Sequence, residues 1–322
     1  MAAIETRACR AGVVFPELGK HWVASECKRD LFSRPSTAYH EVMKAALVQL
    51  NVSDEPAKNL PQTLDWIARA AGQGAEFVLT PEVTNCVSKV RAHQARVLQL
   101  EDQDATLRAL REAAKRERIW LSIGSLALKT KDRDGRFANR SFLVNPAGEI
   151  VARYDKIHMF DVQVSEAETY RESKGYRPGD RAVVAQTPFG GVGLTICYDV
   201  RFPHLHRELA KAGADILLVP AAFSTVTGKA HWEPLLRARA IETGCFVIAT
   251  AQTGQHSPKR ATYGHSLVVS PWGAVLADAG TDVGVMVVDL DLAEVAQARQ
   301  RIAALTHDRE YVPPQCLTKP KA

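Results

Sequence analysis

The chain has 322 residues, of which 46% are hydrophobic and 24% charged, a composition typical of a globular protein with an ample core. Its formal net charge is +5, and no basic block is interleaved with aromatic residues, so nucleic-acid binding is disfavoured. We find no apolar run that could span a membrane, no signal-peptide core at the start and no C-x-x-C pair among the six cysteines. A cytoplasmic enzyme is the expectation.

The first 42 residues differ from the rest of the chain. They show no sustained hydrophobic period and contain several breakers, so residues 1–42 are expected to form an N-terminal extension. It could be a disordered arm, a packed extension or the product of an upstream translation start. The pattern over residues 43–312 has no break in composition and predicts one large domain, followed by a C-terminal tail over 313–322.

Strands and helices alternate through this domain. The first half predicts a strand at 43–52, a helix at 57–74, a strand at 75–83, a helix at 104–119, a strand at 120–128 and a hairpin at 140–158. The second half predicts a hairpin at 181–197, a helix beginning at 202–203, a strand at 216–223, a helix at 230–244, strands at 245–252, 264–278 and 283–292, and a helix at 293–305. Hairpins mixed with α–β alternation favour an α/β fold with mixed sheets, each covered by helices on one face.

One cysteine lies where such a fold exposes reactive groups. In "GLTICYDVRFP" an apolar strand ends at Cys197, and Pro203 lies near the start of the next helix. A thiol on this turn can be exposed and lies near the positive end of a helix dipole, and both conditions favour the thiolate. The alternative is a small apolar filler at a strand end, since free cysteine is often buried.

A nucleophilic cysteine needs a base and a group that stabilises the oxyanion. Glu82 and Lys156 each follow an apolar strand, as Cys197 does, and neighbouring strand ends would bring the three together. Glu82 could then take the thiol proton, and the Lys156 ammonium could stabilise negative charge. An ordinary salt bridge at the domain surface is the alternative for the pair.

Other candidates carry weaker signals. Cys86 lies four residues after Glu82, and Cys245 begins an apolar strand, but neither has a further feature that points to chemistry. His204 and Glu208 have the i, i+4 spacing of a metal pair on a helix, yet no third ligand lies at a suitable spacing. We therefore expect no metal site.

Three segments together resemble a known family. "LTPE" around Glu82, "YDKIH" around Lys156 and "GLTICYDVRFP" around Cys197 are similar, in this order, to the signature segments of the nitrilase superfamily of carbon–nitrogen hydrolases. The resemblance covers about residues 43–312. The segments "RARAIET", "AQTGQH" and "KRATYGHS" further resemble the Nit branch, and within it deaminated glutathione amidases more than ω-amidases.

The resemblance implies a four-layer α-β-β-α sandwich that forms a homodimer or a higher homo-oligomer. It also implies the roles of the site residues: Glu82 as general base, Lys156 and the Tyr198 backbone N–H as oxyanion donors, and Cys197 as nucleophile. A second glutamate lies near the site in this family, and Glu172 is the best match by position. Glu166 and Glu168 are the alternatives in the same loop.

The implied reaction needs no cofactor. It converts a small linear amide to a carboxylate and ammonia through a cysteine thioester. A carboxylate-bearing amide is expected, with deaminated glutathione first. Arg201 resembles the position that holds a substrate carboxylate in some superfamily amidases, although a salt bridge with Asp199 would explain it equally well. Phe223 and Thr227 resemble pocket-wall residues.

Alternative functions remain within and outside this class. An ω-amidase acting on 2-oxoglutaramate or succinamate, or an N-carbamoyl amino acid hydrolase, would use the same chemistry, whereas a true nitrilase is less similar. A non-catalytic scaffold on the same fold is the alternative of a different class. The expected partner is a small-molecule amide, and neither nucleic acid nor membrane is expected.

Overall fold

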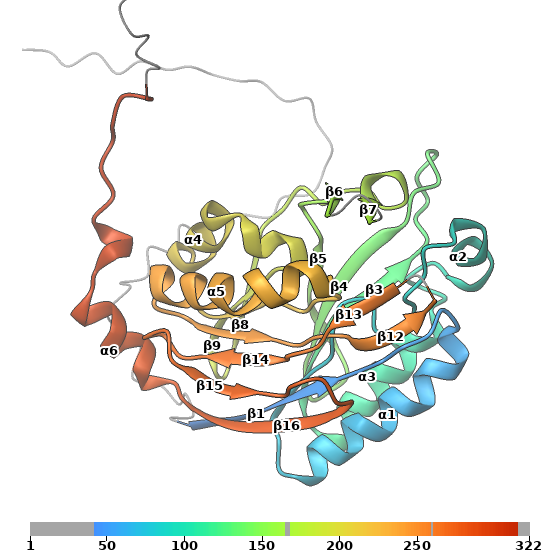
Figure 1. Cartoon of the computed structure of the whole chain (residues 1–322). Helices are drawn as coiled ribbons and strands as arrows, with labels where there is room; N and C mark the ends of the chain where they lie inside the picture. The colour runs from blue at the N-terminus through green and yellow to red at the C-terminus, as the bar shows by residue number, and fades with distance from the viewer. Residues whose placement is uncertain (1–41, 165–167, 259, 315–322) are drawn as a thin grey trace, which may run out of the picture.

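The computed structural model describes residues 42–164, 168–258 and 260–314, which contain two stacked six-stranded sheets (Figure 1). The first sheet has the strand order β16 (Gly284–Asp291), β1 (Val42–Gln49), β2 (Phe77–Leu79), β3 (Trp120–Leu128), β4 (Ala138–Val144) and β5 (Ile150–Asp155). The second has the order β15 (Val275–Asp278), β14 (Leu267–Val269), β11 (Phe246–Ala249), β10 (Ala214–Leu218), β9 (Gly190–Leu194) and β8 (Val183–Thr187).

Both sheets combine parallel and antiparallel pairs. Strands β1, β2 and β3 run parallel at the centre of the first sheet, and β9, β10 and β11 do so in the second. The outer pairs are antiparallel, including the two predicted hairpins, β4–β5 and β8–β9. The expectation of mixed sheets is confirmed.

The alternation of side chains along β1 separates two cores. Ala45 and Leu47 face the second sheet, whereas Ala46 and Val48 pack in the core beneath the helices. Helices α1 (Pro56–Gly72) and α3 (Ala105–Glu117) cover that outer face and contact each other. Asp104 starts α3, because its side chain accepts a hydrogen bond from the Leu107 N–H at 2.7 Å.

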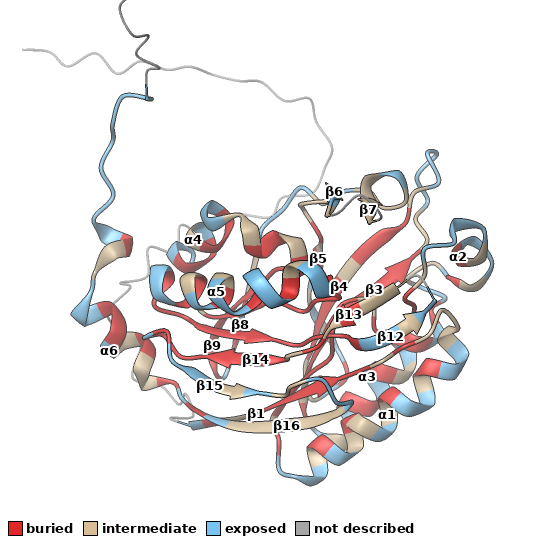
Figure 2. Ribbon diagram, viewed as in Figure 1, coloured by how far each residue is buried: buried red, intermediate tan, exposed pale blue. Residues whose placement is uncertain are grey.

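Helices α4 (Pro203–Lys211) and α5 (Thr225–Thr243) cover the outer face of the second sheet. In α5 the side chains of Trp232, Leu236 and Ala240 recur every four residues and are buried against the sheet. Figure 2 shows buried strands between helices whose outer faces are exposed. The predicted α-β-β-α sandwich is confirmed.

Several elements are absent from the sequence-based prediction. They are α2 (Arg91–Val97), the hairpins β6 (Asp161–Gln163)–β7 (Thr169–Arg171) and β12 (Thr253–Ser257)–β13 (Arg260–Tyr263), and the 3-10 turns η1 (Glu172–Lys174), η2 (Cys197–Arg201) and η3 (Ala304–Thr306). All are short and have no clear hydrophobic period, which explains why the pattern did not reveal them. The late helix α6 (Ala293–Arg301) was predicted.

Strand β1 begins at Val42, which pairs with Asp291 of β16, so the start and the end of the domain lie side by side. The extension expected over 1–42 lies outside the described residues except for Val42, as does most of the tail expected over 313–322. In the described part of the chain, every helix is too short or too polar to cross a membrane.

Candidate active site

The ends of three strands meet at one cavity of about 470 Å³. Glu82 follows β2, Lys156 follows β5 and Cys197 follows β9, and all three side chains line the cavity. Strand β4 is antiparallel to β3, and β5 is antiparallel to β4, so β5 runs in the same direction as β3 and β2. It therefore ends at the same edge of the sheet as β2. The carboxyl ends of strands are the usual place for a site in α/β folds.

A buried lysine joins two glutamates in this cavity. Lys156 Nζ donates to Glu82 Oε1 at 2.9 Å and to Glu172 Oε1 and Oε2 at 3.0 and 2.9 Å. The Lys156 side chain is 2% exposed, so this pair is no ordinary surface salt bridge. Glu172 is therefore the loop glutamate next to the lysine. Glu168 instead bonds Tyr170 and Ser224, and Glu166 lies outside the described residues.

Two further donors hold the glutamates in place. Asn139 Nδ2, on β4, donates to Glu82 Oε1 at 2.9 Å, and the Ala222 N–H donates to Glu82 Oε2 at 2.8 Å. Asn139 also contacts Glu172 Oε1 at 3.4 Å. Asn139 was not predicted from the sequence, because a polar residue within a strand carries no motif. The only available signal is its place on the strand next to β5.

Cys197 lies at the start of η2 in a left-handed backbone conformation, with φ +49°. This conformation is unfavourable for a residue with a side chain and is typical of functional turns. The Cys197 N–H donates to the Pro220 carbonyl at 2.8 Å, which ties the turn to the strand end of β10. The thiol lies close enough to the Glu82 carboxylate that each group shifts the pKa of the other.

Electrostatics keep the Cys197 proton on sulfur while the site is empty. Burial raises the pKa of the Cys197 thiol well above its ordinary value, the Glu82 carboxylate raises it further, and Lys156 lowers it only in part. The expectation that the position of the turn favours the thiolate is therefore wrong, because η2 is short and burial dominates. The cluster of two carboxylates and one ammonium is already negative, so a thiolate would add a like charge.

The charges of Glu82 and Lys156 stabilise each other. Burial alone would raise the pKa of Glu82, but Lys156 and the hydrogen bond from Ala222 outweigh it, and the pKa lies below its ordinary value. Burial alone would lower the pKa of Lys156, yet Glu172 and Glu82 hold that pKa well above its ordinary value. At neutral pH, Glu82 is thus an ionised carboxylate, paired with Lys156, that can accept a proton.

A buried aspartate, Asp199, holds the turn at Cys197 in place through hydrogen bonds. Asp199 Oδ2 accepts from the Tyr154 hydroxyl at 2.7 Å and from the Ile196 N–H at 2.9 Å. Asp199 Oδ1 contacts His158 Nδ1 at 2.7 Å and accepts from the His158 N–H at 3.0 Å. The "YDKIH" and "ICYD" segments are thereby joined, and the residues before and after Cys197 are fixed.

The Tyr198 backbone N–H follows directly after the nucleophile candidate. In the described part of the chain this N–H has no hydrogen-bond acceptor. The Tyr198 side chain lines the cavity and packs against Phe160, with ring centroids 5.1 Å apart. An unpaired N–H beside the thiol is what an oxyanion donor requires.

The three predicted substrate-binding residues lie in different places. Phe223 and Thr227 line the cavity, and Thr227 Oγ1 is buried without a hydrogen-bond partner among the described residues. Arg201 is not part of the cavity wall of the described residues; its guanidinium lies 5.5 Å from the Phe223 ring centroid and contacts His231 at 3.3 Å. The alternative pairing of Arg201 with Asp199 is not formed among these residues.

The other described cysteines lack a base. Cys86 lines the cavity, but burial and the nearby Asp54 and Glu55 raise the pKa of its thiol to about 12. Cys245 is fully buried, and burial raises the pKa of its thiol as well. Of these three thiols, Cys197 is the one whose pKa is shifted by the Glu82 carboxylate.

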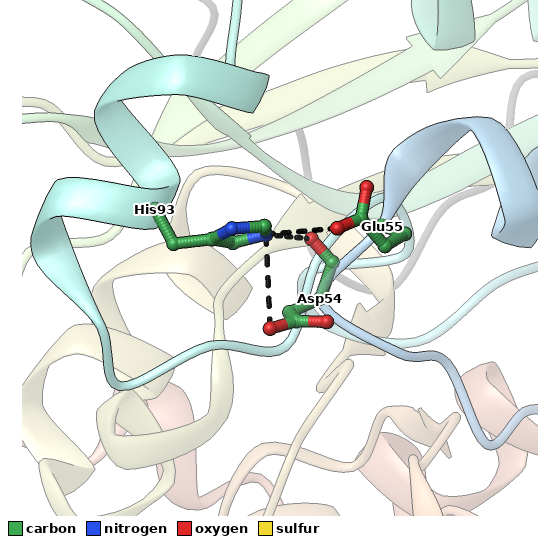
Figure 3. A group of neighbouring side chains, drawn as sticks. All are labelled: Asp54, Glu55 and His93. Atoms are coloured by element: carbon green, nitrogen blue, oxygen red, sulfur yellow. Dashed lines mark hydrogen bonds and ion pairs between the residues drawn. The ribbon is translucent and has the colours of Figure 1, made fainter.

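A histidine lies close to two carboxylates near α2 (Figure 3). His93 Nε2 lies 3.5 Å from Glu55 Oε1 and 3.7 Å from Asp54 Oδ2, but only 2.9 Å from the Asp54 carbonyl oxygen. A carbonyl can only accept, so Nε2 carries the proton, and Nδ1 faces the Arg96 guanidinium at 3.2 Å. These contacts of His93 connect α2 to the loop after β1.

Comparison with known proteins agrees with this geometry. The family model described as carbon–nitrogen hydrolase matches residues 44–300. The chain belongs to the carbon–nitrogen hydrolase family. The resemblance to the nitrilase superfamily is therefore confirmed, and the protein is a hydrolase of carbon–nitrogen bonds.

Individual relatives cover most of the chain. It is 39% identical over 266 residues to the deaminated glutathione amidase of Yersinia enterocolitica, and the alignment covers 82% of this chain and 92% of that protein. The structure of Saccharomyces cerevisiae Nit3, a nitrilase superfamily member, aligns with a TM-score of 0.76 and 29% identity over 86% of this chain and all of that one. A mutant of the Nesterenkonia sp. AN1 amidase, with the acetamide moiety of fluoroacetamide attached to its active-site cysteine, aligns with a TM-score of 0.67 and 29% identity, covering 82% of this chain and 96% of that one.

Proposed function

We propose that this carbon–nitrogen hydrolase is an amidase in which Cys197 forms a thioester with the acyl group of its substrate. The observation that carries the proposal is the buried contact of Glu82 with Lys156 beside the Cys197 thiol. It combines a charged base, a protonated thiol and a fixed ammonium in one cavity. A scaffold would not need to bury these charges together.

Acylation begins with proton transfer. Glu82 takes the Cys197 proton as sulfur attacks the amide carbonyl, so the thiolate forms only together with its new bond. Lys156 has three N–H donors, of which one faces Glu82 and the others face the two Glu172 oxygens, so in the proposed mechanism the oxyanion takes over one of the donors now directed at Glu172. The Tyr198 N–H is the second donor. Protonated Glu82 then gives its proton to the leaving nitrogen, and the C–N bond breaks.

Deacylation returns the enzyme to its initial state. Glu82, again a carboxylate, takes a proton from water, and the hydroxyl attacks the thioester carbonyl. The same two donors hold the second oxyanion. The C–S bond breaks, the carboxylic acid leaves, and Glu82 returns the proton to Cys197 sulfur. The net reaction is amide plus water to acid plus amine, with no cofactor consumed.

For the substrate, we propose deaminated glutathione, which gives several relatives their name. In this compound the amide nitrogen belongs to cysteinylglycine, so its hydrolysis releases a dipeptide and 2-oxoglutarate. Ammonia, the product expected from the sequence, would be released only from a primary amide. The cavity of about 470 Å³ and its cationic lining suit an elongated anionic molecule.

An ω-amidase or an N-carbamoyl amino acid hydrolase would use the same residues and remains the alternative. Phe223 and Thr227 are retained as proposed pocket-wall residues, whereas Arg201 does not line the cavity of the described residues and is not proposed as the carboxylate anchor. Dimer formation and a cytoplasmic location are likewise retained as predictions.

The test is hydrolysis of deaminated glutathione, followed by the appearance of 2-oxoglutarate, with wild type and Cys197→Ala side by side. 2-Oxoglutaramate, succinamate and an N-carbamoyl amino acid serve as competing substrates. We expect the highest kcat/KM for deaminated glutathione and a loss of at least about 10³-fold in the mutant. A higher kcat/KM for a smaller amide would show that deaminated glutathione is not the preferred substrate, and would leave the proposed Cys197 mechanism unchanged. A folded protein inactive on all four would contradict the proposal.

A further inference from the structure

A second charged cluster lines the cavity that contains Cys197. Lys89 from the segment after β2, Tyr170 from β7 and Arg260 from β13 all line it. Lys89 Nζ lies 4.4 Å from the centroid of the Tyr170 ring, and Arg260 Cζ lies 5.3 Å from it. Segments distant in sequence thus bring two cations to one aromatic side chain.

The charges of this cluster are not balanced among the described residues. Glu168, whose Oε1 accepts from the Tyr170 hydroxyl and from Ser224 Oγ, is its only carboxylate there. Burial lowers the pKa of Lys89, Arg260 lowers it further, and Glu168 raises it only in part. Two cations and one carboxylate leave a net charge of +1. A further carboxylate would neutralise it.

Both cations keep hydrogen-bond donors for a ligand. Arg260 uses Nη1 for the Tyr170 hydroxyl at 2.8 Å and Nη2 for the Ala222 carbonyl at 2.5 Å, and it retains other N–H groups. Lys89 Nζ has no hydrogen-bond acceptor within the described ranges. Arg91 differs, because its guanidinium is bound to the carbonyls of Lys174 and Gly135.

We propose that Lys89 and Arg260 form a subsite that binds a carboxylate of the amide substrate and thereby selects anionic amides. The subsite rests on the proposed function, since the amide reaches Cys197 through the same cavity. It is distinct from Arg201, whose guanidinium lies 5.5 Å from the Phe223 ring centroid and is not part of the cavity wall of the described residues. The Ala222 carbonyl couples the subsite to the reaction centre, because the Ala222 N–H binds Glu82.

The test uses two amides of equal chain length. Glutaramate carries a carboxylate where pentanamide carries a methyl group. We expect Lys89→Met and Arg260→Gln each to lower kcat/KM for glutaramate at least about tenfold, mainly through KM, as for the loss of a charge-assisted hydrogen bond. Lys89→Met should change activity on pentanamide by less than about threefold, as expected where no charged contact is lost. Arg260→Gln also loses the bond to the Ala222 carbonyl, so for this variant the ratio of the two kcat/KM values is compared. An equal loss on both amides, or no loss on glutaramate, overturns the proposal.

Arg171→Gln is the matched control. Arg171 lines the same cavity, and its side chain bonds only the Tyr170 carbonyl among the described residues, so this substitution removes one charge and leaves the Lys89 and Arg260 donors in place. The ratio of the two kcat/KM values should stay within about twofold of wild type, because an exposed charge is screened by salt. A change as large as that of Arg260→Gln would show that overall charge decides the preference, and the proposal would fail.

A binding measurement separates this subsite from the amidase activity. Glutarate should raise the thermal unfolding midpoint of Cys197→Ala, which cannot turn over, and adding Lys89→Met should abolish the rise. If turnover is absent but this pattern holds, the subsite stands and the proposed reaction fails. Equal stabilisation of both proteins, or none of either, overturns the subsite.

Discussion

At the scale of single residues, Lys156 determines the protonation of the whole site. Its ammonium lies between Glu82 and Glu172 and keeps Glu82 ionised despite burial. Burial and the same glutamate keep the proton on Cys197. The site therefore differs from a preformed thiolate, and in the proposed mechanism Glu82 takes the Cys197 proton only as the sulfur attacks the substrate carbonyl.

This pattern of charges predicts a broad pH profile. Activity needs ionised Glu82, whose pKa lies below its ordinary value, so kcat/KM should fall only at a pH below about 4.3. The pKa of Lys156 is raised, so its loss of charge should lie above about 10.4. A plateau between these limits is expected with a substrate that does not titrate there. An apparent pKa near 7 in kcat/KM would contradict this assignment.

Asn139 is a positioning residue for Glu82. In Asn139→Leu, Glu82 loses a donor that favours its ionised form, so we expect kcat to fall about 10- to 100-fold and the acid limb to move to higher pH. KM should change little. Asn145→Leu is the control, since Asn145 lies in the exposed β4–β5 turn and its side chain bonds only that turn. A normal acid limb in a folded Asn139→Leu protein would contradict the role.

At the scale of elements, the strands were predictable and the loops were not. Apolar runs ending in Glu82, Lys156 and Cys197 predicted both the strands and the placement of these side chains at their ends. The position of Glu172 came from the resemblance alone, because the segment around β6, β7 and η1 has no hydrophobic period. Lys89 and Arg260 were not predicted for the same reason: only tertiary packing brings the segment after β2 and strand β13 to one cavity.

Gly124, on β3, packs tightly against the segments that follow β2 and β10. A Cβ there would lie 2.1 Å from the Thr80 carbonyl oxygen and 2.6 Å from Pro220 Cβ. These segments lead to Glu82 and hold the Cys197 N–H. We therefore expect Gly124→Ala to lower the free energy of unfolding by about 1–3 kcal/mol and to reduce kcat in the protein that still folds.

The control for that substitution is Gly72→Ala. Gly72 ends α1, and its surroundings leave at least 4 Å free for a Cβ. Alanine has the higher helix propensity, so stability should stay equal or rise by up to about 1 kcal/mol. Denaturant unfolding of both variants checks the pair, and equal stability of Gly124→Ala and wild type would contradict the close approach.

At the scale of the whole molecule, β1 near the start of the domain pairs with β16 near its end, and β16 forms one edge of the first sheet. Val42 is already paired with Asp291, and the match to the family model begins at residue 44. We therefore predict that deleting residues 1–41 leaves kcat/KM within about twofold of the full chain, since the first strand pairing and the family match both begin after residue 41. Loss of soluble or active protein on truncation would contradict this, and would assign the extension a part in folding or assembly.

The central claim is that the acyl group passes through Cys197, and intact-protein mass spectrometry of an acid-quenched reaction tests it most directly. During turnover of deaminated glutathione, wild type should gain the mass of a 2-oxoglutaryl group, located on the peptide that contains Cys197. Cys197→Ala should gain none and should release no 2-oxoglutarate. Turnover without an adduct in wild type, together with an active Cys197→Ala protein, would contradict the account.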